Sequence, residues 1–198
     1  MELLPLEILN LIIEELDMKS ILQIQSINHY YYDNVVIRDL FNIDKEYRDR
    51  LTDNIIKQGK YQLVTKLNAS FNPKITSVSH MTNLQVLHAR GNCGIDQKGI
   101  KELNLVKLYA SYNPKITSVS YMTNLQVLHA RGEKCGIDQE GIKGLNLVDL
   151  DASENPKITS VAHMINLQVL YAWGSCGIDQ EGIKGLNLVK LNASNNKK

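Results

Sequence analysis

The chain has 198 residues, with 22 basic and 21 acidic side chains and a net charge of +1. This length is expected for one domain with a small appendage, and the balanced charge argues against a general binder of nucleic acid or of an anionic membrane surface. The 3 cysteines cannot form an even disulfide framework, which indicates a reducing compartment.

Residues 1–62 lack the repeat that fills the rest of the chain, and their pattern predicts short helices. Pro5 stands near the start of the first helix, where its missing N–H costs nothing, and apolar residues then recur at helical spacing from Ile8 to Leu16. A second helix is expected to begin near residues 17–20, and two others are expected over residues 34–48 and 51–57. Acidic residues interrupt the apolar run, so we expect neither a signal peptide nor a transmembrane helix, and a cytoplasmic or nuclear protein.

The segment from Leu4 to Val35, LPLEILNLIIEELDMKSILQIQSINHYYYDNV, resembles an F-box. The family pattern begins Leu-Pro-x-Glu-(Ile/Leu)-Leu and continues with a Leu-rich helix; the chain departs from it at Ile27–Tyr32, where a basic-aromatic element is usual. The resemblance implies that these helices bind an Skp-type adaptor, which links them to a cullin-RING ubiquitin ligase. The adaptor-binding residues would be Leu4, Pro5, Ile8, Leu9 and Ile12. Alternatively, the helices only cap the open end of a solenoid.

An internal repeat of about forty residues fills the chain from about Val64 onward. NPKITSV stands at Asn72–Val78 and recurs at Asn113–Val119 and Asn155–Val161. Each unit holds two half-repeats that share the skeleton Leu-x-x-Leu-x-Ala-x-x-Asn, with an Ile three residues later. The Leu-x-Ala spacing predicts a short strand with both side chains inward. The skeleton makes Leu84, Leu87, Ala89, Asn92 and Ile95 equivalent to Leu105, Leu108, Ala110, Asn113 and Ile116.

Seven such half-repeats in phase resemble a leucine-rich repeat array. The CGIDQ loops that begin at Cys93, Cys135 and Cys176 are similar to the cysteine-containing subclass without its usual Thr, and the NPKI half-repeats are similar to the short Asn type. The resemblance implies an α/β solenoid over residues 63–198, a short arc of about seven half-repeats, with an F-box-like helical cap over residues 1–62. An F-box followed by cysteine-type repeats is a familiar combination.

Three rows of outward side chains are expected on the concave sheet, before, between and after the inward Leu and Ala of each strand. Copies of the repeat differ mainly on these rows, through selection for binding or through drift after duplication. Trp173, near Tyr171 and Arg131, has the composition of a binding hot spot, although partial packing against neighbouring strands also explains it. The candidate target-binding residues are His88, Arg90, Tyr109, His129, Arg131, Asp149, Asp151, Tyr171 and Trp173.

Catalytic and metal chemistry finds little support in the sequence. Repeat phase accounts for the histidines and cysteines without a metal site, and Asp96, Asp138 and Asp179 are predicted to cap the turns that follow them. No phosphate-binding glycine loop and no nucleophile motif occurs. We therefore expect no enzyme activity, no metal and no cofactor.

The expected function is a monomeric adaptor that holds an unknown target protein on the concave face and presents it to a ubiquitin ligase. The alternative is a recognition scaffold without ubiquitin linkage, in which residues 1–62 serve only as a cap. An effector that competes for host adaptors would be a variant of the first hypothesis and would act in host cytoplasm. Ser194–Lys198 stops where the next loop should begin, which predicts fraying or edge-to-edge association of the last strand.

Overall fold

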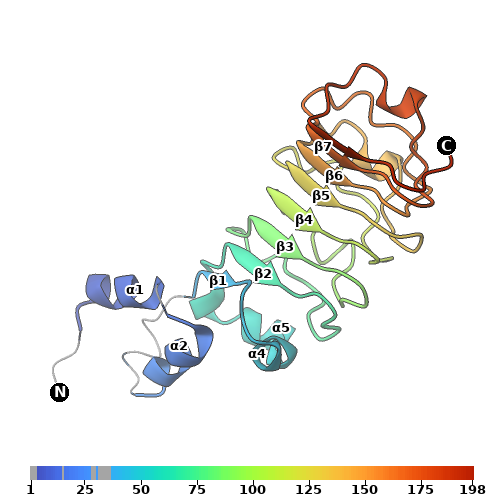
Figure 1. Ribbon diagram of the computed structural model, residues 1–198. Helices are drawn as coiled ribbons and strands as arrows, with labels where there is room; N and C mark the ends of the chain where they lie inside the picture. Colours follow the sequence, from blue (N-terminus) through green and yellow to red (C-terminus); the bar gives the residue numbers. More distant parts are fainter. Residues whose placement is uncertain (1–3, 15, 28–29, 31–36) are drawn as a thin grey trace.

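The structure is a computed structural model that describes residues 4–14, 16–27, 30 and 37–198. Eight short strands stack in chain order into one sheet, and each strand pairs in parallel with the next (Figure 1). They are β1 (Asp39–Leu40), β2 (Lys66–Asn68), β3 (Val86–His88), β4 (Lys107–Tyr109), β5 (Val127–His129), β6 (Asp149–Asp151), β7 (Val169–Tyr171) and β8 (Lys190–Asn192). The predicted repeat solenoid is thereby confirmed.

The strand register follows the predicted skeleton. Leu67 pairs with Leu87, and each later strand places its central Leu beside the previous one. These leucines and the alanines two residues after them are buried up to β7 and form the core. From β2 onward, the strands are connected by turns and two one-turn 3-10 helices, η2 (Glu140–Ile142) and η3 (Glu181–Ile183), so the helical content of this part is low.

Asparagines hold consecutive half-repeats together at the corner after every second strand, and they are buried at all these corners except the last. Asn113 donates its side-chain amide to the carbonyl oxygens of Ala89 and Ile95, at 2.9 and 3.2 Å. Asn72, Asn155 and Asn196 make the equivalent pair of bonds. Each amide thus satisfies two carbonyl groups that the corner removes from water.

The other type of half-repeat uses cysteine at this corner. Asn92, predicted to be equivalent to Asn113, is exposed, while the neighbouring Cys93 is buried. In the next unit the Cys135 sulfur donates to the carbonyl of Ala110 at 3.7 Å, as the Asn113 amide does to Ala89. The predicted equivalence of Asn92 was therefore wrong, because the corner accepts a small apolar thiol one residue later.

Aspartates cap the turns of the cysteine-type half-repeats as predicted. Asp96, Asp138 and Asp179 each accept the backbone N–H three residues later, at 2.8 to 2.9 Å. The glutamines that follow bind the next half-repeat: Gln97 accepts the backbone N–H groups of Thr117 and Ser118, each at 2.9 Å. The recurrent carboxylates therefore have a structural role in the solenoid.

In the described residues before the sheet, the chain forms the helices α1 (Leu6–Glu14) and α2 (Met18–Gln25), which lie beyond the first strand at the N-terminal end of the stack (Figure 1). Both were expected. The helix predicted over residues 34–48 was wrong for 37–44, where the chain forms β1 before α4 (Lys45–Arg50); residues 34–36 lie outside the described part. Two one-turn helices follow, α5 (Asp53–Ile56) and η1 (Gly59–Tyr61).

Residues 37–64 form a diverged first half-repeat. Leu40 pairs with Leu67 in the sheet, and Ile37 is buried three residues before Leu40, just as Val64 precedes Leu67. Asp53 accepts the N–H groups of Thr76 and Ser77, the bonds that Gln97 makes one unit later. The sheet therefore begins inside residues 1–62, the segment predicted to be a helical domain, and it has eight strands where about seven half-repeats were expected.

Candidate functional site

The outward middle row of the sheet carries a ladder of rings. Phe41 lies beside His88 with ring centroids 4.5 Å apart, His88 lies 4.0 Å from Tyr109, and Tyr109 lies 4.6 Å from His129. The parallel register brings the last three together, as predicted, because each occupies the third position of its strand. Phe41 follows β1 and was not predicted; the Ile37-x-x-Leu40 spacing is the signal that would have found it.

The two histidines in this ladder are held in the neutral form. Burial, followed by the charges of Arg90 and His129, lowers the pKa of His88 from 6.5 to about 4. Burial also lowers the pKa of His129, although Asp151 and Asp149 act in the opposite direction. At neutral pH the row therefore presents aromatic surface, and the positive charge on this part of the face comes from arginine and lysine.

A second cluster surrounds Arg131 in the last row. Its guanidinium carbon lies 4.2 Å from the Trp173 ring centroid and 5.5 Å from that of Tyr112. Its Nε donates to Glu154 Oε2 at 3.2 Å, and the Tyr112 hydroxyl donates to the same oxygen at 2.7 Å. These bonds lower the pKa of Glu154, so the carboxylate is charged. Trp173 and Arg131 are thus brought together as predicted, in contact with each other.

Tyr112 and Glu154 were missed by the sequence analysis. Each stands one residue beyond the last predicted row, with φ of 59° and 57°, a left-handed conformation that Phe71 and Asn195 share at the same place in their units. Because Tyr112 and Glu154 both contact Arg131 of the last row, this fourth row borders the face. The signal was variation at that position between copies of the half-repeat, although the serine just before it is unchanged: Phe71, Tyr112, Glu154 and Asn195.

Acidic residues gather on β6. Asp151 accepts the Ser153 backbone N–H at 3.0 Å, whereas Asp149 Oδ1 is buried without a hydrogen-bond partner among the described residues. Burial is the main reason that the pKa of Asp149 is raised. On the next strands, Lys190 Nζ lies 2.7 Å from the Tyr171 hydroxyl.

All nine predicted target-binding residues lie on the outward face of the sheet or just after its strands.

The N-terminal helix α1 exposes an apolar stripe. Ile8 is 47% exposed and Leu11 65%, with Ile12 beside them, and Leu4 and Pro5 are exposed just before the helix. Leu9, also predicted to contact an adaptor, is only 1% exposed and belongs to the core, which corrects that prediction. Leu11 was missed although it lies three residues after Ile8, on the same side of the helix.

The cysteines show no features of a reactive or metal-binding site. Burial raises the pKa of the Cys93 thiol from 9.0 to about 11 and raises the pKa values of Cys135 and Cys176 as well. Within residues 4–14, 16–27, 30 and 37–198, no group of three or more His, Cys, Asp or Glu side chains is arranged to hold a metal ion. No helix in the same residues is long and apolar enough to cross a membrane.

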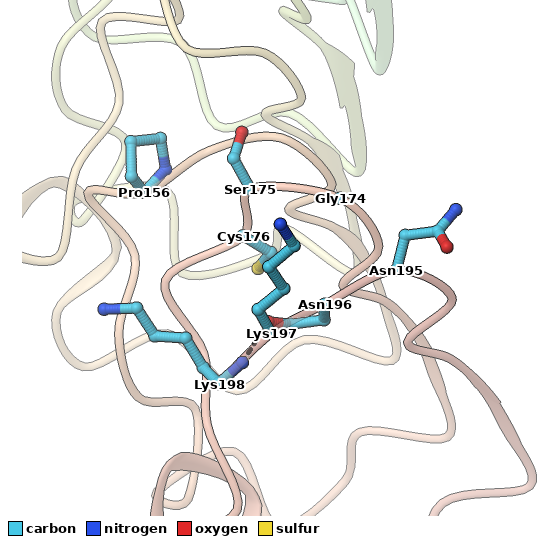
Figure 2. A pocket seen from close by; sticks show the side chains of 8 residues that line it. All are labelled: Pro156, Gly174, Ser175, Cys176, Asn195, Asn196, Lys197 and Lys198. Atoms are coloured by element: carbon cyan, nitrogen blue, oxygen red, sulfur yellow. Dashed lines mark hydrogen bonds between the residues drawn. The ribbon is translucent and has the colours of Figure 1, made fainter.

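A pocket of about 540 Å³ lies at the C-terminal end, between the Gly174–Cys176 corner and the last four residues (Figure 2). Its walls include the buried Cys176 and two terminal lysines, and no residue of the three predicted rows. The main candidate surfaces are therefore the sheet face and the α1 stripe.

The sequence matches no protein-family model and no curated protein.

Proposed function

We propose that the chain is a non-catalytic adaptor in which α1 binds an Skp-type partner and a leucine-rich repeat solenoid holds a target protein on its sheet face. The apolar stripe of α1 is the observation that carries the proposal. Ile8, Leu11 and Ile12 are exposed on a helix whose other side buries Leu9 and Ile13. A short helix with apolar side chains on both sides fits one that packs on its own domain and on a partner.

The contacts of residues 37–64 support a role for α1 beyond capping. A solenoid must cover the first edge of its core, and here β1, Asp53 and the carbonyl groups of Arg48 and Leu51 meet the first full repeat. The segment after α2 therefore covers the edge of the first full repeat. A helix needed only as a cap would gain nothing from an apolar outer face.

The sheet face supports the target-binding half of the proposal. Its rows combine stacked rings, two arginines and a tryptophan, the residue types that dominate binding hot spots. Strands about 4.8 Å apart give eight of them a face roughly 34 Å long, which is enough for a peptide or one surface of a domain. Because the framework between the rows is uniform, recognition would depend on the variable outward side chains.

A second candidate is a recognition scaffold whose N-terminal helices contact no adaptor. The observation in its favour is that Leu9, Ile13 and Ile21 belong to the same buried cluster as Ile37 and Leu40. Through this shared core, α1 and α2 add to the cover on the first half-repeat. The two candidates differ in whether a partner buries the exposed side of α1.

Calorimetric titration of the full chain with a purified Skp-type adaptor tests the proposal. We expect binding by the wild type and its loss in an Ile8→Asp, Leu11→Asp variant, because two charges would enter an apolar interface. The matched control is Ile165→Asp, which places a charge at a 78% exposed isoleucine on the solenoid and should leave binding unchanged. A folded wild type that fails to bind would favour the scaffold.

A further inference from the structure

Arg90 and Arg131 occupy equivalent positions in consecutive repeats but have different electrostatic partners. Both lie two residues after a strand, and both guanidinium groups contact a ring: Arg90 over Tyr109 at 5.1 Å, Arg131 over Trp173 at 4.2 Å. Arg131 forms an ion pair with Glu154. Among the described residues, no carboxylate pairs with Arg90, and its Nε is buried without an acceptor.

The repeat geometry explains this difference. The fourth-row residue on the N-terminal side of each arginine donates its backbone N–H to the arginine carbonyl: Phe71 to Arg90 at 3.1 Å and Tyr112 to Arg131 at 2.8 Å. The fourth-row residue on the other side is Tyr112 for Arg90 and Glu154 for Arg131. The position that supplies a carboxylate to Arg131 therefore holds a tyrosine next to Arg90, and that tyrosine donates its hydroxyl to Glu154.

The surroundings of Arg90 have the character of a binding site. His88, on the same strand, also has a buried ring nitrogen, Nε2, without a partner among the described residues. Phe71, which is 69% exposed, places its ring against Gly91, directly after Arg90. A buried donor such as Arg90 Nε is costly when it has no partner, so an oxyanion here would satisfy the arginine while the exposed Phe71 ring contacts an apolar group beside it.

We propose that Arg90 anchors a carboxylate side chain of the target protein, adjacent to an apolar residue that packs on Phe71. The Arg131–Glu154 pair shows within the same molecule how a carboxylate meets an arginine at this position, with 3.2 Å between Nε and Oε2. The inference rests on the proposed target-binding role of the sheet face and is independent of the α1 contact. The occupant is thus an acidic segment with a neighbouring apolar side chain.

Selection of short random peptides, displayed on phage, against the full chain tests this inference. The wild type should enrich Asp or Glu next to an apolar residue. Arg90→Gln should remove the acidic preference and weaken binding of the best selected peptide by about tenfold or more, the loss expected for a charged hydrogen bond. Lys107→Gln, which removes one charge from an exposed lysine on the same face, is the charge-matched control and should keep the preference.

A gain-of-preference variant keeps the test decisive even if Arg90→Gln fails to fold. Glu154→Gln frees Arg131, two strands or about 9.6 Å from Arg90, and should add a second enriched acidic position. The inference is overturned if the wild type enriches no acidic residue, if Arg90→Gln keeps the preference, or if Glu154→Gln adds none. The calorimetric titration with the adaptor measures binding at α1 only, so a failure of the adaptor contact can be distinguished from a failure of the Arg90 inference.

Discussion

The Asn113 side-chain amide donates to the carbonyl oxygen of Ala89 at 2.9 Å, across the boundary between two half-repeats. The same amide reaches Ile95, and its own oxygen accepts the Lys115 backbone N–H at 2.8 Å. One buried side chain thus satisfies three backbone groups, and the bonds repeat along the stack. The solenoid is therefore stabilised by corner hydrogen bonds as well as by its leucine core.

Replacing Asn113 with Ala should destabilise the solenoid strongly. The substitution leaves buried carbonyl groups without donors, at about 1–3 kcal/mol for each group left unpaired. Urea unfolding followed by circular dichroism measures the effect. Asn92→Ala, at the exposed asparagine of the neighbouring half-repeat, is the matched control and should change stability by less than about 0.5 kcal/mol. Equal effects of the two substitutions would contradict the assigned corner bonds.

Leu9 and Ile8 are adjacent in α1 but should respond differently to truncation. Leu9→Ala removes a fully buried side chain and should lower the free energy of unfolding by about 2–5 kcal/mol. Ile8→Ala changes an exposed side chain and should have an effect within about 0.5 kcal/mol. Thermal or urea unfolding of both variants checks this. A large loss for Ile8→Ala would mean that the outer stripe is part of the fold.

Stability should fall on acidification through the titration of His88. The folded protein holds the pKa of His88 at about 4, below its usual 6.5, so the unfolded chain takes up the proton first. The titration of His88 therefore costs no stability above pH about 6.5, and it lowers the free energy of unfolding as the pH falls towards about 4. His88→Gln should reduce the difference between urea midpoints at pH about 7 and about 4.5. An unchanged difference would show that His88 does not contribute.

The buried cysteines should react slowly in the folded protein. Burial holds the pKa of Cys93 at about 11, so very little thiolate is present near neutral pH. A colorimetric thiol reagent at pH about 8 should modify the native chain much more slowly than the urea-unfolded chain. Rapid reaction of all three thiols in the native state would contradict the buried positions of Cys93, Cys135 and Cys176.

Much of the repeat geometry could be predicted because it follows from two features of the sequence, the Leu-x-Ala spacing and the repeat period. Leu-x-Ala fixes which side chains point inward, and the repeat period then places His88, Tyr109 and His129 in one row, as the structure confirms. The turn caps at Asp96, Asp138 and Asp179 could be predicted because these aspartates recur at the same place in each CGIDQ loop. Identical local sequence produces identical local structure when each unit packs on a copy of itself.

The missed features depend on interactions that a repeat pattern does not encode. The first half-repeat keeps only Ile37 and Leu40 of the skeleton, so its match to the repeat is weak, and the pairing of β1 with β2 shows it directly. Leu9 and Ile8 both fit the apolar pattern, so which of them is buried depends on the neighbours that α1 packs against. The contact between Glu154 and Arg131 involves a residue in the left-handed conformation, one position beyond the three predicted rows.

Hydrogen exchange of the full chain with and without a saturating Skp-type adaptor tests the central claim most directly. The account predicts slower exchange of backbone amides within residues 4–14 on binding and unchanged exchange over β2–β7, because the partner covers α1 and leaves the sheet face open. Unchanged exchange in α1 at saturation, or protection confined to the sheet strands, would contradict it.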